Sequence, residues 1–185
     1  MDRGTIMTSR PADASVRKCY HLCRSVLRNA AYYRGGESLS AKPPPGNNFA
    51  ISARNNSLDL AIIDWCKIFA DGRGKHNFKK ILLDNDAFEA ELLEEFRIMG
   101  VVLHDFIKNV ARYRDKEVAH ADVYDRIDIP SLEPIIQSTI LLYRALRIQC
   151  GLEPQPVAPH DLQKAFQEEE ALACLCFNAL SGVAL

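Results

Sequence analysis

Apolar residues recur along most of the chain at alternating steps of four and three residues, which is the spacing of one face of an α-helix. The longest stripe begins at Leu92 and ends at Tyr113, and others begin at Val16, Leu58 and Leu132. No segment keeps a sustained period of two, so the pattern predicts helices and no sheet. A repeat of about 3.5 residues keeps one seam turned toward a neighbouring helix. We therefore expect an all-α fold, an antiparallel up-and-down bundle of four to five main helices.

Turn-forming residues separate these stripes. Residues 71–74 contain two glycines and end the helix that begins near Leu58. Asp84 or Asn85 is placed to cap the next helix, and Pro130 opens the helix that carries the last of the four stripes. The stripes and these signals together predict where the main helices begin and end.

We expect a single domain over residues 1–185, because a chain of 185 residues is long enough for one core and short for two. Its core spans residues 15–150. Within that range, residues 35–48 start with two glycines and include three consecutive prolines, which predicts a long exposed loop. Residues 151–185 begin with a proline-rich stretch and predict a C-terminal loop and helix.

The composition is that of an ordinary globular protein, with 48% hydrophobic and 25% charged residues and a net charge of −1. No window is apolar enough for a membrane span, and the first ten residues lack the apolar core of a signal peptide. The six cysteines lack the dense spacing of a secreted disulfide scaffold. We therefore expect a cytoplasmic protein that does not contact a membrane. RNA binding would need a local basic patch.

One basic run lies beside two glycines. Its charged members are Arg73, Lys75, Lys79 and Lys80. Such a run has two interpretations, a solvated loop or a contact surface for an RNA backbone.

Residues 112–122 carry the strongest candidate chemistry, because Arg114 and His120 lie six positions apart in one polar segment after the longest stripe. Arginine is a permanent cation that can bind phosphate through two hydrogen bonds, and histidine titrates near neutral pH. Asp115 could orient either residue, and Lys116 could add charge. The alternative is a solvated helix end with local ion pairs.

The spacing has a geometric consequence. On an uninterrupted α-helix, positions six apart are rotated by about 120° and separated by about 9 Å along the axis, too far to bind one phosphate from a single chain. Either the helix breaks between Arg114 and His120, or two copies of the segment meet across a two-fold axis and line one cleft. The second option makes a homodimer a condition of activity.

Such a cleft could cut RNA without a metal. The 2′-hydroxyl of RNA can attack the adjacent phosphorus once a base removes its proton. His120 could take that proton or donate one to the leaving oxygen, and Arg114 could stabilise the negative charge that builds on the phosphate. Two copies of His120 could divide the acid and base roles.

Two metal-like patterns are weaker. Glu117 and His120 form a Glu-x-x-His pair of the kind that di-iron bundles use twice, but no other histidine has a glutamate three residues before it. Cys19, His21 and Cys23 offer two thiols on one helical face without two further ligands, so core packing is favoured over zinc. We expect no metal and no cofactor.

The run Arg-Asp-Lys-Glu-Val-Ala-His-Ala-Asp at 114–122, between a long helix and a helix opened by proline, resembles the Arg-X(4–6)-His signature of the HEPN superfamily. In the branch of that family linked to abortive infection, the run has the form Arg-Asn/Asp-Lys-x-x-Ala-His-x-Asp. The resemblance covers the motif strongly and residues 15–150 loosely.

The resemblance implies an all-α up-and-down bundle, a homodimer with the motif at its interface, and metal-independent endoribonuclease activity. Arg114 and His120 match the catalytic pair, and Asp115 matches the polar position after the arginine. The family also implies a toxin–antitoxin or abortive-infection system of phage defence, with a nucleotidyltransferase antitoxin as candidate partner. Some members carry a tyrosine two residues after the histidine that the antitoxin modifies, but this chain has Asp122 there. Other HEPN proteins are non-catalytic interaction modules in two-component complexes, which is the alternative function.

Overall fold

The computed structural model describes residues 12–37, 48–118, 128–150 and 162–180. Helices account for 86% of these described residues and none of them forms a strand, so the predicted all-α class is confirmed. Their bounds are α1 Ala12–Glu37, α2 Asn48–Phe69, α3 Phe78–Ile81, α4 Asn85–Ile98, α5 Leu103–Tyr113, the π-helix η1 Arg114–Val118, α6 Leu132–Cys150 and α7 Leu162–Leu180. Within the described ranges, no helix combines the length and the apolar character needed to cross a membrane.

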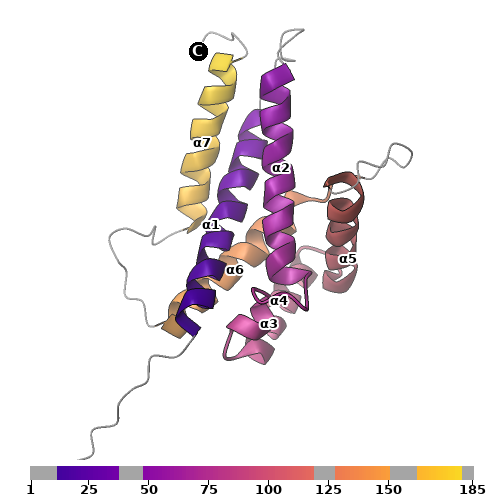
Figure 1. Ribbon diagram of the computed structural model, residues 1–185, viewed down its shortest axis with the longest axis vertical. Coiled ribbons are helices and arrows are strands. Elements are labelled where there is room, and N and C mark those ends of the chain that lie inside the picture. Colours follow the sequence, from indigo (N-terminus) through magenta and orange to yellow (C-terminus); the bar gives the residue numbers. More distant parts are fainter. Residues whose placement is uncertain (1–11, 38–47, 119–127, 151–161, 181–185) are drawn as a thin grey trace, which may run out of the picture.

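The three helices α1, α2 and α7 lie side by side, with α1 between the other two (Figure 1). α2 runs antiparallel to α1 and α7, α6 crosses α1 at an angle, and α5 lies on the side of α2 away from α7. This arrangement places the segment that starts at Arg114 against α2 and on the far side of that helix from α7.

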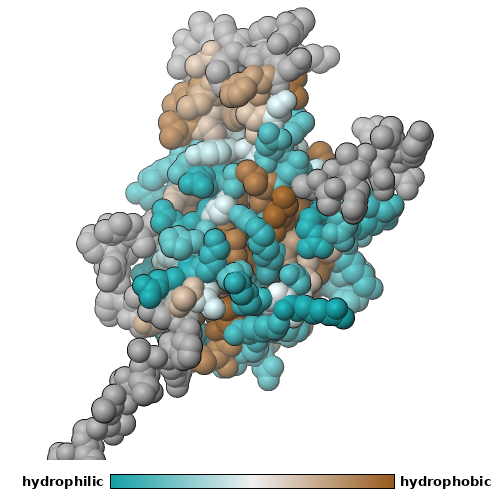
Figure 2. All heavy atoms as spheres, viewed as in Figure 1, coloured by the Kyte–Doolittle hydropathy of each residue, from teal (hydrophilic) through white to brown (hydrophobic). Residues whose placement is uncertain are grey.

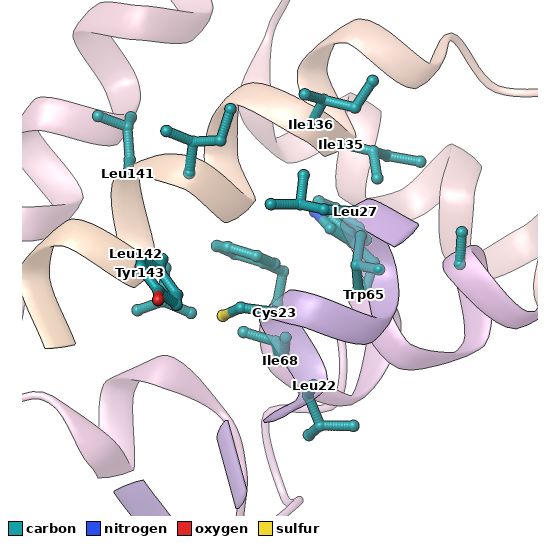
Figure 3. Close-up of a cluster of buried hydrophobic side chains, with 14 of the residues drawn as sticks. Leu22, Cys23, Leu27, Trp65, Ile68, Ile135, Ile136, Leu141, Leu142 and Tyr143 are labelled. Carbon is teal, nitrogen blue, oxygen red and sulfur yellow. The ribbon is translucent and has the colours of Figure 1, made fainter. Parts of the chain in front are cut away.

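The core lies where α1, α2 and α6 meet, as Figure 3 shows. Trp65 is fully buried at its centre and stacks on Phe69 with ring centroids 4.9 Å apart. Its indole Nε1 donates to the Ser138 Oγ at 2.9 Å, so the polar atom of this large side chain is paired inside the core. The predicted stripes supply many of the buried residues, because one face of each helix turns inward.

The expectation that the chain leaves its helix at Gly35 is wrong, because α1 continues through Gly35 and Gly36 to its end at Glu37. Gly35 lies against α7: a Cβ placed on it would be 2.6 Å from the Cβ of Ala173 and 2.8 Å from the backbone carbonyl of Glu170. The missing side chain therefore permits close packing of two helices, and this packing outweighs the low helix propensity of glycine.

The longest stripe is two helices rather than one. α4 ends in a Schellman motif in which Gly100 has a φ of +70°, and the Gly100 and Val101 amides donate to the carbonyls of Arg97 and Phe96 at 3.0 and 2.9 Å. The apolar spacing continues across this break because α4 and α5 both face the same core. The predicted cap at the start of α4 is confirmed, since the Asp84 Oδ1 accepts from the Ala87 amide at 3.1 Å.

The predicted C-terminal helix is α7, and it packs on α1. Leu162 and Phe166 belong to the main core, and Phe177 joins Ala50 in a smaller apolar cluster beside Tyr32. Cys176 in this helix is exposed. Cys19 and Cys23, in contrast, are fully buried, as expected.

Candidate functional site

The candidate site begins where α5 changes its hydrogen bonding. From Arg114 to Val118 the chain forms a π-helix, in which each amide pairs five residues back instead of four. The α-helical rotation between Arg114 and a residue six positions later therefore does not apply here. His120 belongs to residues 119–127, outside the described residues, so its placement stays a prediction. Single π turns are frequent at functional sites in helices.

Two contacts with α2 fix the start of the motif. The Tyr113 hydroxyl donates to the Asp59 Oδ1 at 3.3 Å, and Arg114 lies beside Cys66. Asp59 and Cys66 are seven residues apart, about two helical turns, and so lie on the same face of α2. Tyr113 is 7% exposed, and its ring anchors the end of α5 in the core. Arg114 therefore directly follows a residue that is anchored to α2.

Asp115 orients the guanidinium of Arg114, as the sequence suggested. The Arg114 Nε donates to the Asp115 Oδ1 at 2.7 Å, and the Arg114 Nη2 lies 2.7 Å from the same oxygen in an ion pair. The Arg114 side chain is 30% exposed and that of Asp115 is 59% exposed, so solvent reaches the pair. Lys116 follows in the same π turn and is partly exposed. A phosphate that approached Arg114 would meet a guanidinium with one edge already occupied by a carboxylate.

The charge of Arg114 is strongly maintained. Partial burial disfavours it, but the hydrogen bond to Asp115 and the acidic groups of Cys66 and Asp71 outweigh that effect and raise its pKa above the ordinary value. Burial raises the pKa of the Cys66 thiol to about 12, although the neighbouring Arg114 acts in the opposite direction. Cys66 thus stays a neutral thiol at physiological pH and does not serve as nucleophile or base beside Arg114.

Asp59, Cys66 and Asp71 are neighbours of the motif that sequence reasoning missed. They are far from Arg114 along the chain, so no local sequence pattern connects them to the motif. The seven-residue spacing of Asp59 and Cys66 is the one available hint, because it puts a carboxylate and a thiol on one face of α2. An acid within an apolar helix face usually has a partner, and here that partner is Tyr113.

The members of the predicted basic run differ in their contacts. Lys79 forms an ion pair with Glu89 at 2.8 Å, and the Lys80 Nζ donates to the backbone carbonyl of Arg73 at 2.7 Å. Lys75 and Arg73 are exposed in the turn before α3. The contacts of Lys79 and Lys80 are local, and a role of this run in RNA binding stays a prediction.

No group of three or more His, Cys, Asp or Glu side chains suited to a metal ion is found among the described residues. The comparisons with known proteins gave no match: neither a family model, nor a curated protein, nor a solved structure is significantly similar to this chain. Any function assigned to this chain therefore depends on the motif and on the surroundings of Arg114.

Proposed function

We propose that this protein is a metal-independent endoribonuclease of the HEPN type that acts as a homodimer in a toxin–antitoxin or abortive-infection system. Arg114 binds the scissile phosphate and stabilises its developing charge, and His120 is the acid or base. The observation that carries the proposal is that Arg114 of the Arg-X(4–6)-His motif begins a π turn and directly follows Tyr113, which donates a hydrogen bond to Asp59 of α2. The fold expected of that family is an up-and-down bundle, and the all-helical architecture is compatible with it.

The reaction needs two proton transfers and one stabilised charge. A base removes the proton of the 2′-hydroxyl, the 2′-oxygen bonds to phosphorus, and the bond from phosphorus to the 5′-oxygen breaks as that oxygen receives a proton. The products are a 2′,3′-cyclic phosphate and a 5′-hydroxyl. Arg114 is suited to the charge on the phosphate, because its pKa lies above an already high ordinary value.

The proton transfers require groups beyond the described surroundings of Arg114. Its nearest ionisable partners there are Asp115, which already accepts from the guanidinium, and Cys66, which is a buried neutral thiol. His120 and its copy in a second chain are therefore the proposed acid and base. This division of roles makes the dimer part of the catalytic site.

Incubation of the protein with RNA in EDTA tests the proposal. The wild-type chain should release fragments that end in a 2′,3′-cyclic phosphate, and Arg114→Ala and His120→Ala should each slow cleavage by about 100-fold or more. Arg112→Ala is a matched control, since Arg112 is an exposed arginine two residues before the motif. Unchanged cleavage by either motif variant would refute the assignment.

Mass measurement in solution tests the shared cleft. A monomer at micromolar concentration that still cleaves RNA would contradict the dimeric site. A neighbouring gene for a nucleotidyltransferase would support the toxin form of the proposal, because that enzyme is the expected antitoxin.

A second function, a non-catalytic helical interaction module, is favoured by one observation. Asp115 accepts a hydrogen bond from Arg114 and forms an ion pair with it, and Asp71 adds further negative charge nearby, so the arginine could be part of a purely structural network. If a folded dimer cleaves no RNA, and if Arg114→Ala lowers the unfolding temperature without another effect, the interaction module is the better function.

A further inference from the structure

A cleft of about 450 Å³ lies over the outward face of α1, with walls from α2 and α7. In Figure 1, α1 lies between α2 and α7. In Figure 2, hydrophilic residues cover the middle of the face where α2 and α7 flank α1, below an apolar upper end. The floor of the cleft includes the buried side chains of Leu22 and Phe166. Its size is in the range of small-ligand sites.

The rim of this cleft is basic although the whole chain has a net charge of −1. One face of α1 contributes most of the rim, and α2 adds Lys67. The α1 residues recur at steps of three or four and are Lys18, His21, Arg24 and Arg28. All four are exposed, so their charged groups reach solvent at the mouth of the cleft.

The two carboxylates in the cleft are engaged by other partners. Asp64 accepts from Lys67 at 2.7 Å, and Glu169 faces the Tyr32 hydroxyl, whose pKa is raised by burial and by this carboxylate. Lys18, Arg24 and Arg28 form no ion pair with any described residue. The acids are thus committed inside the fold while the α1 cations remain available to an external anion.

His76 provides an independent sign of the local potential. Its pKa lies below the ordinary value because of burial and because of the positive charges of Lys75, Lys18 and Lys67. Two of these lysines line the cleft, and the third belongs to the basic run at 73–80. The positive region therefore continues from the cleft to the turn that precedes α3.

The length of the cationic row indicates the kind of ligand. Ten residues separate Lys18 from Arg28, which corresponds to about 15 Å along the helix axis, and Arg24 and Arg28 are about 6 Å apart along it. A single carboxylate or phosphate would use only part of such a row. We propose that this cleft binds a ligand with several phosphate groups, with Arg24 and Arg28 bound to successive phosphates and Lys18 at one end.

This site is distinct from Arg114, which lies beside Cys66 on a different face of α2, and it does not depend on the proposed cleavage. The same chemistry is offered by an RNA strand and by a free nucleoside triphosphate. Two probes distinguish these sources: a 2′-O-methyl oligouridylate of about 12 nucleotides, measured by fluorescence anisotropy, and ATP, measured by calorimetry. The oligonucleotide has no free 2′-hydroxyl, so the cleavage reaction proposed above cannot consume it.

The variants compare equal changes of charge at two places. Arg24→Glu with Arg28→Glu alters the cleft, and Lys108→Glu with Arg144→Glu makes the same change at exposed positions of α5 and α6. The cleft pair should weaken binding of the recognised probe by tenfold or more, because it removes two charge-assisted hydrogen bonds and adds two negative charges beside the phosphates. For the oligonucleotide it should also reduce the slope of log affinity against log salt by about 1.4. The control pair should change neither by much, and thermal unfolding confirms that both double variants are folded.

Each outcome decides the proposal. Binding of the oligonucleotide alone identifies an RNA backbone as the ligand, binding of ATP alone identifies a free nucleotide, and binding of both supports the shared phosphate chemistry. The proposal is overturned if neither probe binds at about 100 mM salt. It is also overturned if the control pair weakens binding as much as the cleft pair, or if an acidic peptide of equal charge binds as tightly as either probe. Arg114→Ala should bind the probe normally, so failure of the ribonuclease proposal would leave this one standing.

Discussion

The contact of Gly35 with α7 leads to a prediction about the substitution Gly35→Ala. In an unobstructed helix, replacing glycine by alanine stabilises the fold by about 0.5–1 kcal/mol. At Gly35 the added carbon would lie 2.6 Å from the Ala173 Cβ and 2.8 Å from both the Glu170 carbonyl and the Cys174 amide nitrogen. Carbon atoms normally approach to about 3.5–4.0 Å, so α7 would have to move outward by about 1 Å.

The two effects oppose each other, and the packing effect is the larger. Overpacking of this kind costs about 1–3 kcal/mol, which exceeds the gain in helix propensity. We expect Gly35→Ala to lower the free energy of unfolding by about 1–2 kcal/mol, and the unfolding temperature by about 2–8 °C. Urea unfolding followed by fluorescence is a suitable assay, because the chain contains one tryptophan, Trp65, and it is fully buried.

Gly36→Ala is the matched control. A Cβ on Gly36 would meet Cγ and Cδ of Arg54 at 2.8 and 2.9 Å, and these atoms belong to a flexible side chain that can move aside. The remaining contact, with Cε2 of Phe177 at 3.3 Å, needs only a small shift of that ring. This variant should be neutral or slightly more stable than the wild type. If Gly35→Ala is as stable as Gly36→Ala, close packing of α1 and α7 is not the reason that the helix continues through these glycines.

Three further predictions concern single side chains. Asp115→Asn should lower KM for RNA by up to about fivefold. The exposed ion pair between Asp115 and Arg114 competes with phosphate for the guanidinium and is worth up to about 1 kcal/mol. A higher KM at unchanged kcat would contradict this. Ser138→Ala should cost about 1–3 kcal/mol in urea unfolding, because it leaves the buried indole Nε1 of Trp65 unpaired, and Thr139→Ser, which keeps a hydroxyl in the next position, should cost less. The pKa of Cys66 rises from 9.0 to about 12 on folding, so its contribution to stability is complete below pH 9 and is lost between about pH 9 and 12. Cys66→Ala should therefore make the fall in stability above pH 9 shallower, by up to about 1.4 kcal/mol per pH unit, and an unchanged slope would show that this thiol is not responsible.

The sequence predicted the helices well where burial alone decides the pattern. The stripe that begins at Leu58 continues at Ile62, Trp65 and Phe69, and all four residues are buried in α2. It did not predict the helix through Gly35, which depends on contact between two helices. It also did not predict the break at Gly100, where the apolar spacing continues from one helix into the next. Gly35 has a helical conformation because of α7, which is more than 100 residues away along the chain, and the stripe through Gly100 hides a left-handed residue.

Only the contacts between residues that are neighbours in the sequence could be predicted for the site. The pair of Arg114 and Asp115 is adjacent in sequence, and its hydrogen bond could be expected from residue type alone. The contacts with Asp59 and Cys66 could not, because they depend on how α5 packs against α2. The basic cleft was missed for the same reason. Lys18, Arg24 and Arg28 look like the ordinary solvated face of a helix until α2 and α7 are placed on either side of it.

The π turn at Arg114–Val118 also bears on how this segment tolerates insertions and deletions. A π turn contains one residue more than the α turn it replaces, so removing one residue from 115–118 would restore α-helical pairing without pulling on α5. The number of residues between Arg114 and a later histidine is then only loosely constrained. The gain or loss of one residue can be accommodated by a switch between π-helical and α-helical hydrogen bonds.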